Sequence, residues 1–364
     1  MKLTGTTNAA LAAEIKNAIP AEEELLLDFG GCILRVLSST RALHDDLAEY
    51  FKEFTTTSDT PEITISAHEA PVPEFALNFS VKQPDPGKTK IKEEWVDLDD
   101  GRVVRKRLTG MYFLFGNGEN VAVGHCLENS NQVINFINNR FIEWKLNQGG
   151  LLGHAAGVIH AGRGISLAGF SGAGKSTLAL HLMSRGTDFL SNDRVMVEAD
   201  GDGVVMYGVA KQPRINPGTA LHNPDLSGIV EPELREKFLA MPPAELWQLE
   251  HKYDALIDEC YGPGKFHLRS PMNALVILNW KRDGGEMKAA LVDPRERHDL
   301  LPAFMKGTGL FYRPDDPAKQ DDPGVEAYAD LLARADLLEI SGGVDFDLAA
   351  DLCLRYMETG KPPE

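Results

Sequence analysis

Hydrophobic and polar residues alternate with the two-residue period of β-strands over much of the first 125 positions. Turn residues separate the apolar runs, among them the pairs Gly30-Gly31 and Asn117-Gly118. Leucine and aromatic residues recur at helical spacing between 43 and 54. The elements predicted here are a loosely held helix or arm at 1–20, hairpins at 25–37, 95–105 and 111–123, an amphipathic helix at 43–54 and a strand at 63–67. This part of the chain is therefore expected to be β-rich, with an α+β fold.

From about residue 126, strand-like apolar runs alternate with segments of helical period. The predicted helices lie at 129–148, 176–185, 295–305, 324–335 and 345–358, and the predicted strands at 165–168, 189–197, 204–207, 274–279, 288–292 and 337–341. Strands that alternate with helices are typical of an α/β fold, here a mixed sheet flanked by helices. We therefore expect two domains, residues 1–125 and residues 126–364.

The segment between the strand at 165–168 and the helix at 176–185 fits G-x-x-x-x-G-K-[ST], the phosphate-binding loop of nucleotide-using enzymes. Its glycines can adopt backbone angles that turn successive N–H groups towards a phosphate, and the following helix points its positive end at the same anion. Lys175 is expected to reach the outer phosphates, and the Ser176 hydroxyl to hold Mg²⁺. The residues expected to contact the nucleotide are Gly169, Phe170, Ser171, Gly172, Ala173, Gly174, Lys175, Ser176 and Thr177.

Phosphoryl transfer also needs a second acid for Mg²⁺ and a group that orients or deprotonates the acceptor. Asp193 is the nearest acid after the loop helix, and a strand returning beside the loop strand would bring it towards Lys175 and Ser176. Asp193 is therefore a candidate metal or base residue, the alternative being a surface carboxylate paired with Arg194. His154 precedes the loop, but a lone histidine is more often a satisfied structural residue. Individually weak candidates for phosphate contacts are Lys211, Arg214, Lys252 and Arg269.

The formal net charge of −17 argues against a nucleic-acid partner and against an anionic membrane surface. No stretch approaches the roughly 20 apolar residues of a membrane span, and the N-terminus leads into no signal-peptide run. The four cysteines are far apart and form no C-x-x-C pair, a pattern typical of reduced thiols. We therefore expect a soluble cytoplasmic protein.

Four segments together resemble one family. The segments 153–157, 169–176, 185–186 and 190–195 are similar to the catalytic domain of HPr kinase/phosphorylase, and the chain as a whole resembles the HPr kinase-related kinase B group. The specific match covers about 151–197, and weaker similarity runs from about 125 to the C-terminus. The resemblance implies a P-loop kinase core of the HPr kinase/PEP carboxykinase-like type, use of ATP and Mg²⁺, and transfer to a serine of a protein.

The same resemblance implies roles for individual side chains. It makes His154 part of a catalytic His/Asp system and Asp193 part of the metal and base pair. The family has two aspartates where this chain has Asn192-Asp193. A neutral Asn192 can orient a hydroxyl but cannot accept its proton. The family's E-x-R-G-x-G-I motif has no match after the loop, and residues 1–125 do not match its usual N-terminal domain. These departures argue against phosphorylase activity and against HPr as the acceptor.

We therefore predict an ATP-dependent, Mg²⁺-requiring P-loop kinase that phosphorylates a hydroxyl, in first place a serine of a small partner protein. A kinase for a sugar or polyol metabolite and a nucleotide-binding sensor with little catalysis are the alternatives. A deep closed pocket near Asp193 would favour the metabolite kinase, and an open cleft the protein kinase. Residues 1–125 are expected to recognise the acceptor or to support a homo-oligomer, and residues 126–364 to be catalytic.

Overall fold

The computed structural model describes residues 1–84, 90–316 and 322–362, and it divides the chain into two compact units. The first unit contains Met1–Gln148 and Thr308–Gln320, and the second contains Gly149–Gly307 and Asp321–Glu364. The helix expected at 129–148 therefore belongs to the N-terminal unit, whereas the expected domain boundary at residue 125 placed it in the second domain. The roles expected of the two parts stay predictions.

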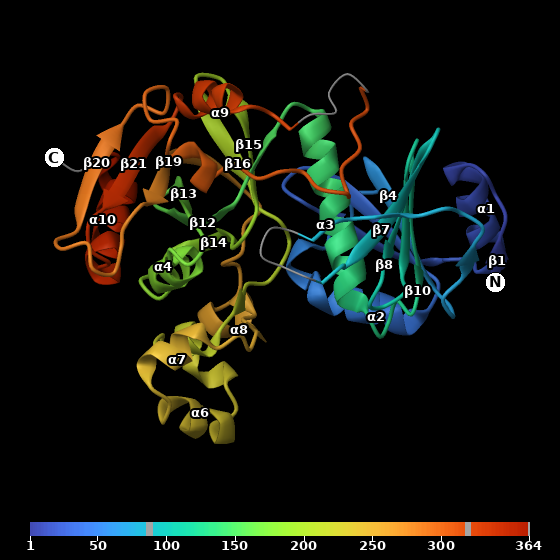
Figure 1. Ribbon diagram of the computed structural model, residues 1–364, viewed down its shortest axis with the longest axis horizontal. Helices are drawn as coiled ribbons and strands as arrows, with labels where there is room; N and C mark the ends of the chain where they lie inside the picture. Colours follow the sequence, from blue (N-terminus) through green and yellow to red (C-terminus); the bar gives the residue numbers. More distant parts are fainter. Residues whose placement is uncertain (85–89, 317–321, 363–364) are drawn as a thin grey trace. The chain divides into compact units, whose positions relative to one another are not determined.

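The first unit is built on a mixed sheet with the strand order β2-β3-β4-β10-β9-β8-β7-β6 among the described residues (Figure 1). The elements are β1 (Lys2–Leu3), α1 (Asn8–Ala18), β2 (Glu23–Asp28), β3 (Ile33–Ser38), α2 (Arg41–Tyr50), η1 (Lys52–Phe54), β4 (Ile63–Glu69), β5 (Glu74–Phe75), β6 (Ser80–Val81), β7 (Glu93–Leu98), β8 (Gly101–Lys106), β9 (Tyr112–Gly116), β10 (Glu119–Gly124) and α3 (Ser130–Asn147). The predicted hairpins are confirmed as β2-β3, β7-β8 and β9-β10. Asn117 and Gly118 both have positive φ, 51° and 80°, as a tight hairpin turn requires.

Helix α1 corrects the expectation of a loosely held arm. Its residues Leu11 and Ile15 are fully buried, and they belong to a core cluster with residues of β8, β9 and β10. Asn8 is fully buried as well, and its side-chain amide donates a hydrogen bond of 3.1 Å to the Gly116 carbonyl. The sequence pattern does not predict the burial of this helix, because alanines fill much of it. They weaken the apolar periodicity without preventing close packing.

The segment 308–316 lies late in the chain but belongs to the first unit. The Phe311 ring packs among aromatic rings of β9 and α3, with centroid distances of 5.6 Å to Phe113, 5.8 Å to Phe115 and 6.2 Å to Phe136. The Arg102 guanidinium donates hydrogen bonds to the carbonyls of Leu310 and Tyr312, at 3.0 and 3.2 Å. This segment therefore completes the core of the first unit.

The second unit contains a mixed sheet with the order β11-β15-β16-β19-β13-β12-β14 in the described part of the chain, where β21 also pairs with β19 and β20 (Figure 1). The elements are β11 (Leu151–Gly153), β12 (Ala155–His160), β13 (Arg163–Gly169), α4 (Lys175–Met183), β14 (Asp188–Ser191), β15 (Val195–Asp200), β16 (Gly203–Tyr207), β17 (Arg214–Ile215), α5 (Pro217–Leu221), η2 (Ser227–Ile229), α6 (Pro232–Leu239), α7 (Pro243–Gln248), β18 (Tyr253–Asp254), α8 (Ile257–Tyr261), β19 (Arg269–Leu278), β20 (Lys288–Val292), η3 (Leu301–Ala303), α9 (Val325–Leu332), β21 (Asp336–Ser341) and α10 (Phe346–Thr359).

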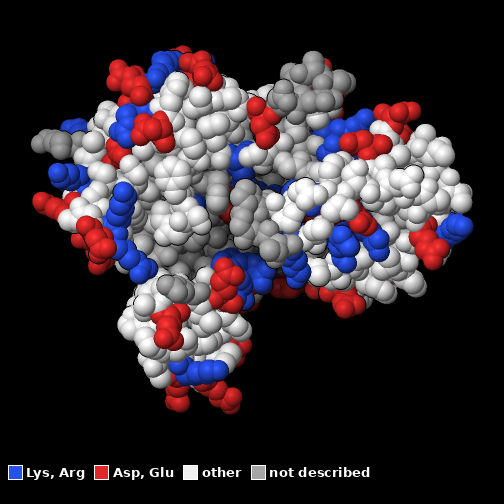
Figure 2. All heavy atoms as spheres, in the orientation of Figure 1, with Lys and Arg blue, Asp and Glu red and all other residues white. Residues whose placement is uncertain are grey.

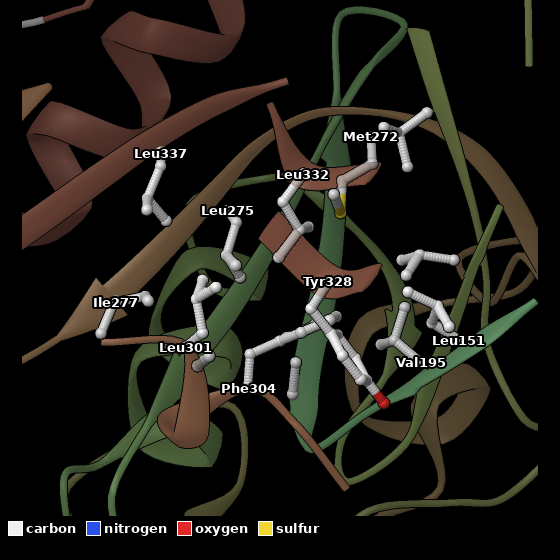
Figure 3. Packing of buried hydrophobic residues seen from close by; sticks show 14 of the residues in the cluster. Leu151, Val195, Met272, Leu275, Ile277, Leu301, Phe304, Tyr328, Leu332 and Leu337 are labelled. Atoms are coloured by element: carbon white, nitrogen blue, oxygen red, sulfur yellow. The ribbon is translucent and has the colours of Figure 1, made fainter. Parts of the chain in front are cut away.

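Both faces of this sheet are covered, and the strand residues alternate between the two faces. Along β19, Val276 and Leu278 pack in one core cluster with α4 and α10, whereas Leu275 and Ile277 pack in another with η3 and α9. Figure 3 shows the second cluster, with Phe304 and Tyr328 at its centre; their ring centroids lie 6.1 Å apart. The architecture of this unit is thus a mixed α/β fold with helices on both faces.

Two local predictions in this unit are wrong. The strand expected at 189–197 is two strands, β14 and β15, separated by a break at 192–194. The two strands have different partners, because β14 pairs with β12 while β15 pairs with β11 and β16. The helix expected at 295–305 is a turn followed by the short helix η3.

Among the described residues, no helix has both the length and the apolar character that crossing a membrane demands. The four cysteines are free; Cys32, Cys126 and Cys353 are buried, and Cys260 is half-buried.

Candidate functional site

The predicted loop lies at an edge of the second sheet where three parallel strands end. Strand β19 pairs in parallel with β13 on one side and with β21 on the other. Their carboxyl ends at Gly169, Leu278 and Ser341 therefore meet at one edge. Ligands of open α/β sheets bind at such carboxyl ends. The edge brings together the loop after β13, Trp280 after β19 and Phe346 at the start of α10.

The loop itself is a glycine-lined turn at the N-terminus of α4. Gly172 and Gly174 have φ angles of 82° and 91°, in the left-handed region that other residues rarely adopt. A Cβ atom on Gly174 would lie 2.6 Å from a Phe346 ring atom, whereas one on Gly172 would have no atom within 4 Å. The Ala173 amide donates to the Phe170 carbonyl at 3.0 Å, which tightens the turn. This geometry suits an anion at the start of a helix.

Lys175, Ser176 and Thr177 are the first residues of α4, directly after the loop. Lys175 is half-buried, and its Nζ donates a hydrogen bond of 2.8 Å to the Gly169 carbonyl, so the side chain folds back over the loop. Burial lowers the pKa of Lys175, with Lys306 acting in the same direction and the Asp193 charge opposing it. Ser176 is half-buried, and Thr177 Oγ1 lies 3.2 Å from Thr219 Oγ1 on α5. Of the other loop residues, Phe170, Ser171 and Gly172 are exposed, and Gly169 is buried.

The loop is contacted by two aromatic side chains that the sequence analysis did not assign to the site, Trp280 and Phe346. The Trp280 indole N–H donates a hydrogen bond of 2.8 Å to the Ala173 carbonyl, and Trp280 is only 8% exposed. Its ring meets that of Phe346 edge-on, with centroids 5.1 Å apart. The available signal was an aromatic residue just past the carboxyl end of a buried strand. Trp280 and Phe346 therefore fix the loop between Ala173 and Gly174.

His154 and Asp193 face each other where two antiparallel chain segments both leave strand conformation, between β11 and β12 and between β14 and β15. Two antiparallel residue pairs, Gly153–Val195 and Gly157–Ser191, lie on either side of the break. The second pair continues the register of the first. His154 Nε2 lies 3.3 Å from Asp193 Oδ1. The expectation that Asp193 lies on a strand beside the loop strand is wrong, because β12 and β19 are the neighbours of β13. The break at 192–194 positions Asp193 instead.

Close approach explains the glycine of the Gly153-His154 pair. A Cβ atom on Gly153 would lie 2.2 Å from the Phe304 ring, so only glycine fits there. The chain at 304–306 runs beside this glycine, where the His154 amide donates to the Phe304 carbonyl at 2.5 Å and the Lys306 amide to the Leu152 carbonyl at 3.1 Å. This pairing holds His154 in place and brings Lys306 to the site.

Asp193 lies in a field of positive charge. Desolvation alone would raise the pKa of the Asp193 carboxyl, but the hydrogen bond to His154 and the charges of Lys306, His154 and Arg194 outweigh it. The pKa of Asp193 therefore lies well below its usual range. Both Asp193 and His154 remain accessible, with 57% and 40% of their side chains exposed. An ionised, accessible carboxylate beside an imidazole can bind a metal ion or orient a hydroxyl.

Further basic residues surround this pair. Arg194 Nε lies 3.6 Å from Asp193 Oδ2, so the pairing considered as an alternative exists beside the His154 contact. Burial lowers the pKa of Lys211, as do the charges of Arg194 and Arg214, while Asp193 opposes them. Arg214 itself pairs with Asp254 at 3.0 Å.

Arg269, Lys252 and Lys306 differ in their relation to the site. Arg269 lies 3.9 Å from Asp200 and over the Tyr207 ring, so the structure does not bring it to Asp193. Lys252 is exposed between α7 and β18, and no ion pair among the described residues joins it to Asp193. Lys306 was missed because it follows a predicted helix and has no motif of its own.

The residues at the edge have the oxygen donors that a small divalent cation prefers. The side-chain oxygen of Asn192 is buried and accepts no hydrogen bond from the described part of the chain. The Ser176 hydroxyl and the Asp193 carboxylate also supply oxygen atoms, the donor type that Mg²⁺ prefers. Within the described ranges, no three His, Cys, Asp or Glu side chains group to hold a metal.

A cavity of about 600 Å³ in the second unit lies at the other ends of the parallel strands. Its lining includes Arg163, Met272 and Asp336, near the starts of β13, β19 and β21, and none of the predicted site residues. The cavity and the glycine-rich loop are therefore separate features of the sheet.

Comparisons with known proteins found similar chains among solved structures. No family model matches the chain, and no curated protein matches it. Among solved structures, it is similar to the HPr(Ser) kinase/phosphatase from Coxiella burnetii, with 12% sequence identity and a TM-score of 0.30. The match covers 57% of this chain and 97% of that chain. The chemistry of the site therefore rests on its own residues.

Proposed function

We propose that the second unit is an ATP-dependent, Mg²⁺-requiring kinase that transfers the γ-phosphate to a hydroxyl group. One observation carries the proposal. A glycine-lined loop at a helix N-terminus and an ionised, histidine-paired carboxylate belong to the same unit, where burial lowers the pKa of Lys175 and the Asp193 charge opposes that shift. Phosphoryl transfer needs both parts, one for the donor and one for the metal and acceptor.

Each residue then has a role. Backbone amides of the loop and Lys175 would hold the β- and γ-phosphates, in which case Lys175 leaves the Gly169 carbonyl that it contacts here. Ser176, Asp193 and Asn192 would hold Mg²⁺, which when bound neutralises charge on the phosphates. Trp280 and Phe346 would keep the loop in shape from the side facing away from the nucleotide.

The transfer moves one proton and one phosphoryl group. The acceptor hydroxyl oxygen forms a bond to the γ-phosphorus, the bond from that phosphorus to the β,γ-bridging oxygen breaks, and ADP leaves. The hydroxyl proton passes to His154, because histidine is the commonest general base and the low pKa of Asp193 makes its carboxylate a weak one. Asp193 orients the imidazole and binds the metal.

We propose a serine of a partner protein as the acceptor. His154 and Asp193 are each at least 40% exposed, which suits an extended segment of another protein better than an enclosed metabolite. For the first unit we propose recognition of parts of the acceptor protein outside the serine segment, or assembly into a homo-oligomer. A kinase for a small hydroxyl metabolite is the alternative outcome of the test.

The test uses the full chain, γ-labelled ATP with Mg²⁺, and a soluble extract separated into protein and metabolite fractions. Label in the protein fraction, stable to mild acid and lost in alkali, is the expected result. The variants Lys175→Met and Asp193→Asn should lose transfer, whereas Lys288→Met, at an exposed site on β20, serves as a matched control.

Three outcomes would contradict the proposal in different ways. Label only in metabolites would replace the protein acceptor with a small one. ATP binding without any transfer would favour a sensor. Full activity in Asp193→Asn would show that the metal and acceptor site lies elsewhere.

A further inference from the structure

The site contains more positively charged side chains than are needed to bind the phosphates of the donor, and the additional ones lie on the acceptor side. A phosphate loop supplies a lysine and a magnesium ion for the donor's phosphates, here Lys175 and the ion held through Ser176. Arg194, Lys211 and Lys306 are additional. The charges of Lys306 and Arg194 act on the carboxylate of Asp193, the residue assigned to the acceptor and metal side, and the Asp193 charge acts on Lys211.

These three cations come from separate parts of the second unit. Arg194 directly follows Asp193 in the break between β14 and β15, and its Nε lies 3.6 Å from the Asp193 carboxylate. Lys306 is held by backbone pairing with Leu152, two residues before His154. Lys211 follows β16, in a segment where Gly208 passes so close to the Leu190 carbonyl that a Cβ atom would lie 2.0 Å from it. All three segments therefore run along the chain that contains His154 and Asp193.

The local charge contrasts with the rest of the molecule. The chain has a formal net charge of −17, and acidic and basic side chains are interspersed over the face drawn in Figure 2. An acidic ligand is therefore repelled by the molecule as a whole and needs a local cationic surface to bind. Burial lowers the pKa of Lys211 and the Arg194 charge acts in the same direction, effects that a bound anion would oppose.

We propose that the acceptor is an acidic segment of a partner protein, a serine flanked by aspartate or glutamate, bound by Arg194, Lys211 and Lys306. The inference rests on the proposed kinase function and names its substrate class. His154 and Asp193 are 40% and 57% exposed, so both can contact a serine of another protein. Basic side chains at the rim then pair with the flanking carboxylates and align the hydroxyl with His154.

The test measures binding directly, so that it does not depend on turnover. Two fluorescein-labelled peptides of one length carry a central serine, one with glutamate and one with glutamine at every flanking position. Anisotropy is measured with the full chain, alone and saturated with MgADP. We expect the glutamate peptide to bind about tenfold more tightly, with a preference that weakens as salt rises.

Charge-removal variants locate the binding. Lys211→Met and Lys306→Met should each weaken the glutamate peptide about threefold to fivefold, the range of one exposed charge pair, and should affect it more than MgADP. Lys288→Met is the matched control, since Lys288 is exposed on β20. A fluorescent ADP analogue reports nucleotide binding separately; its failure to bind would overturn the kinase function itself.

The remaining outcomes decide the acceptor class. Equal affinity for the two peptides, or a preference unchanged by both lysine variants, overturns the proposal. Variants that weaken MgADP more than the peptide would assign these lysines to the donor. Displacement of the peptide by glycerol 3-phosphate at lower concentration than by the unlabelled peptide would replace the protein segment with a phosphorylated metabolite.

Discussion

Trp280 and Ala173 are joined by a hydrogen bond of 2.8 Å, from the indole N–H on one side of the sheet edge to a carbonyl of the glycine-rich loop. A turn with two glycines in left-handed conformations has few bonds of its own to hold it. The contact therefore anchors the loop to the buried strand β19, which ends two residues before Trp280.

Replacing Trp280 with phenylalanine removes the N–H donor and keeps an aromatic ring against Phe346. We expect nucleotide affinity to fall about fivefold to tenfold, the equivalent of one hydrogen bond, with a smaller change in the stability of the unit. Titration with a fluorescent ADP analogue measures it. Trp95→Phe, in the first unit, is the control, and equal affinities of the two variants would contradict the assignment.

Gly153→Ala places a methyl group 2.2 Å from a Phe304 ring atom. Because the ring is fully buried and cannot move far, we expect the free energy of unfolding of the second unit to fall by about 1–3 kcal/mol. Chemical denaturation measures this. The double variant with Phe304→Leu should recover part of the loss, since the two changes meet at one contact. Strict additivity of the two changes would argue against this clash.

Tyr328→Phe removes a buried hydroxyl whose hydrogen bond to the Leu152 carbonyl is 2.7 Å long. The same burial raises the pKa of Tyr328 to about 12. The Leu152 carbonyl keeps the Lys306 amide as a second donor, so we expect a loss of only about 0.5–1.5 kcal/mol. Urea denaturation of the full chain tests this, and a loss above that range would mean that Tyr328 also orders the chain around His154.

His68 gives the first unit a defined pH dependence. It is fully buried; Nδ1–H donates to the Ile19 carbonyl at 2.6 Å, and Nε2 lies 2.8 Å from the Ser66 hydroxyl. Burial lowers the pKa of His68, the Lys16 charge acts in the same direction, and the bond to Ile19 opposes them. The fold therefore favours the neutral ring, whereas the unfolded chain takes up a proton below about pH 6.5.

The stability that His68 contributes is consequently complete above pH 6.5 and is lost as the pH falls towards its folded-state pKa, by up to about 1.4 kcal/mol per pH unit. Denaturation curves of the full chain followed by tryptophan fluorescence between pH 7.5 and 5 should show this slope. The variant His68→Gln should lack that part of the slope. Identical slopes in the two proteins would show that His68 titrates similarly in the folded and unfolded states.

Local sequence patterns predicted most of the strands and the glycine-rich loop, because period and turn residues depend only on neighbouring positions. The pair Asn117-Gly118 and the two left-handed glycines of the loop illustrate this. Helix α1 shows the limit of the same approach, since its burial depends on the sheet that it packs against.

The arrangement around Asp193 could not be derived in the same way. The break that positions it exists because two adjoining strands pair with different partners, which no property of residues 189–197 reveals. Lys306 and Trp280 reach the site through pairing with residues more than 100 positions away. Such contacts are set by topology, and a pattern along one stretch of chain does not contain them.

The late segment with Phe311 has a consequence for how the polypeptide matures. During synthesis, N-terminal domains generally fold first, as they leave the ribosome. Here the aromatic cluster of Phe113, Phe115 and Phe136 cannot close around Phe311 until nearly the whole chain has emerged. The N-terminal unit therefore starts first but finishes late, and the nascent chain must keep its open cluster from aggregating while the second unit is being translated.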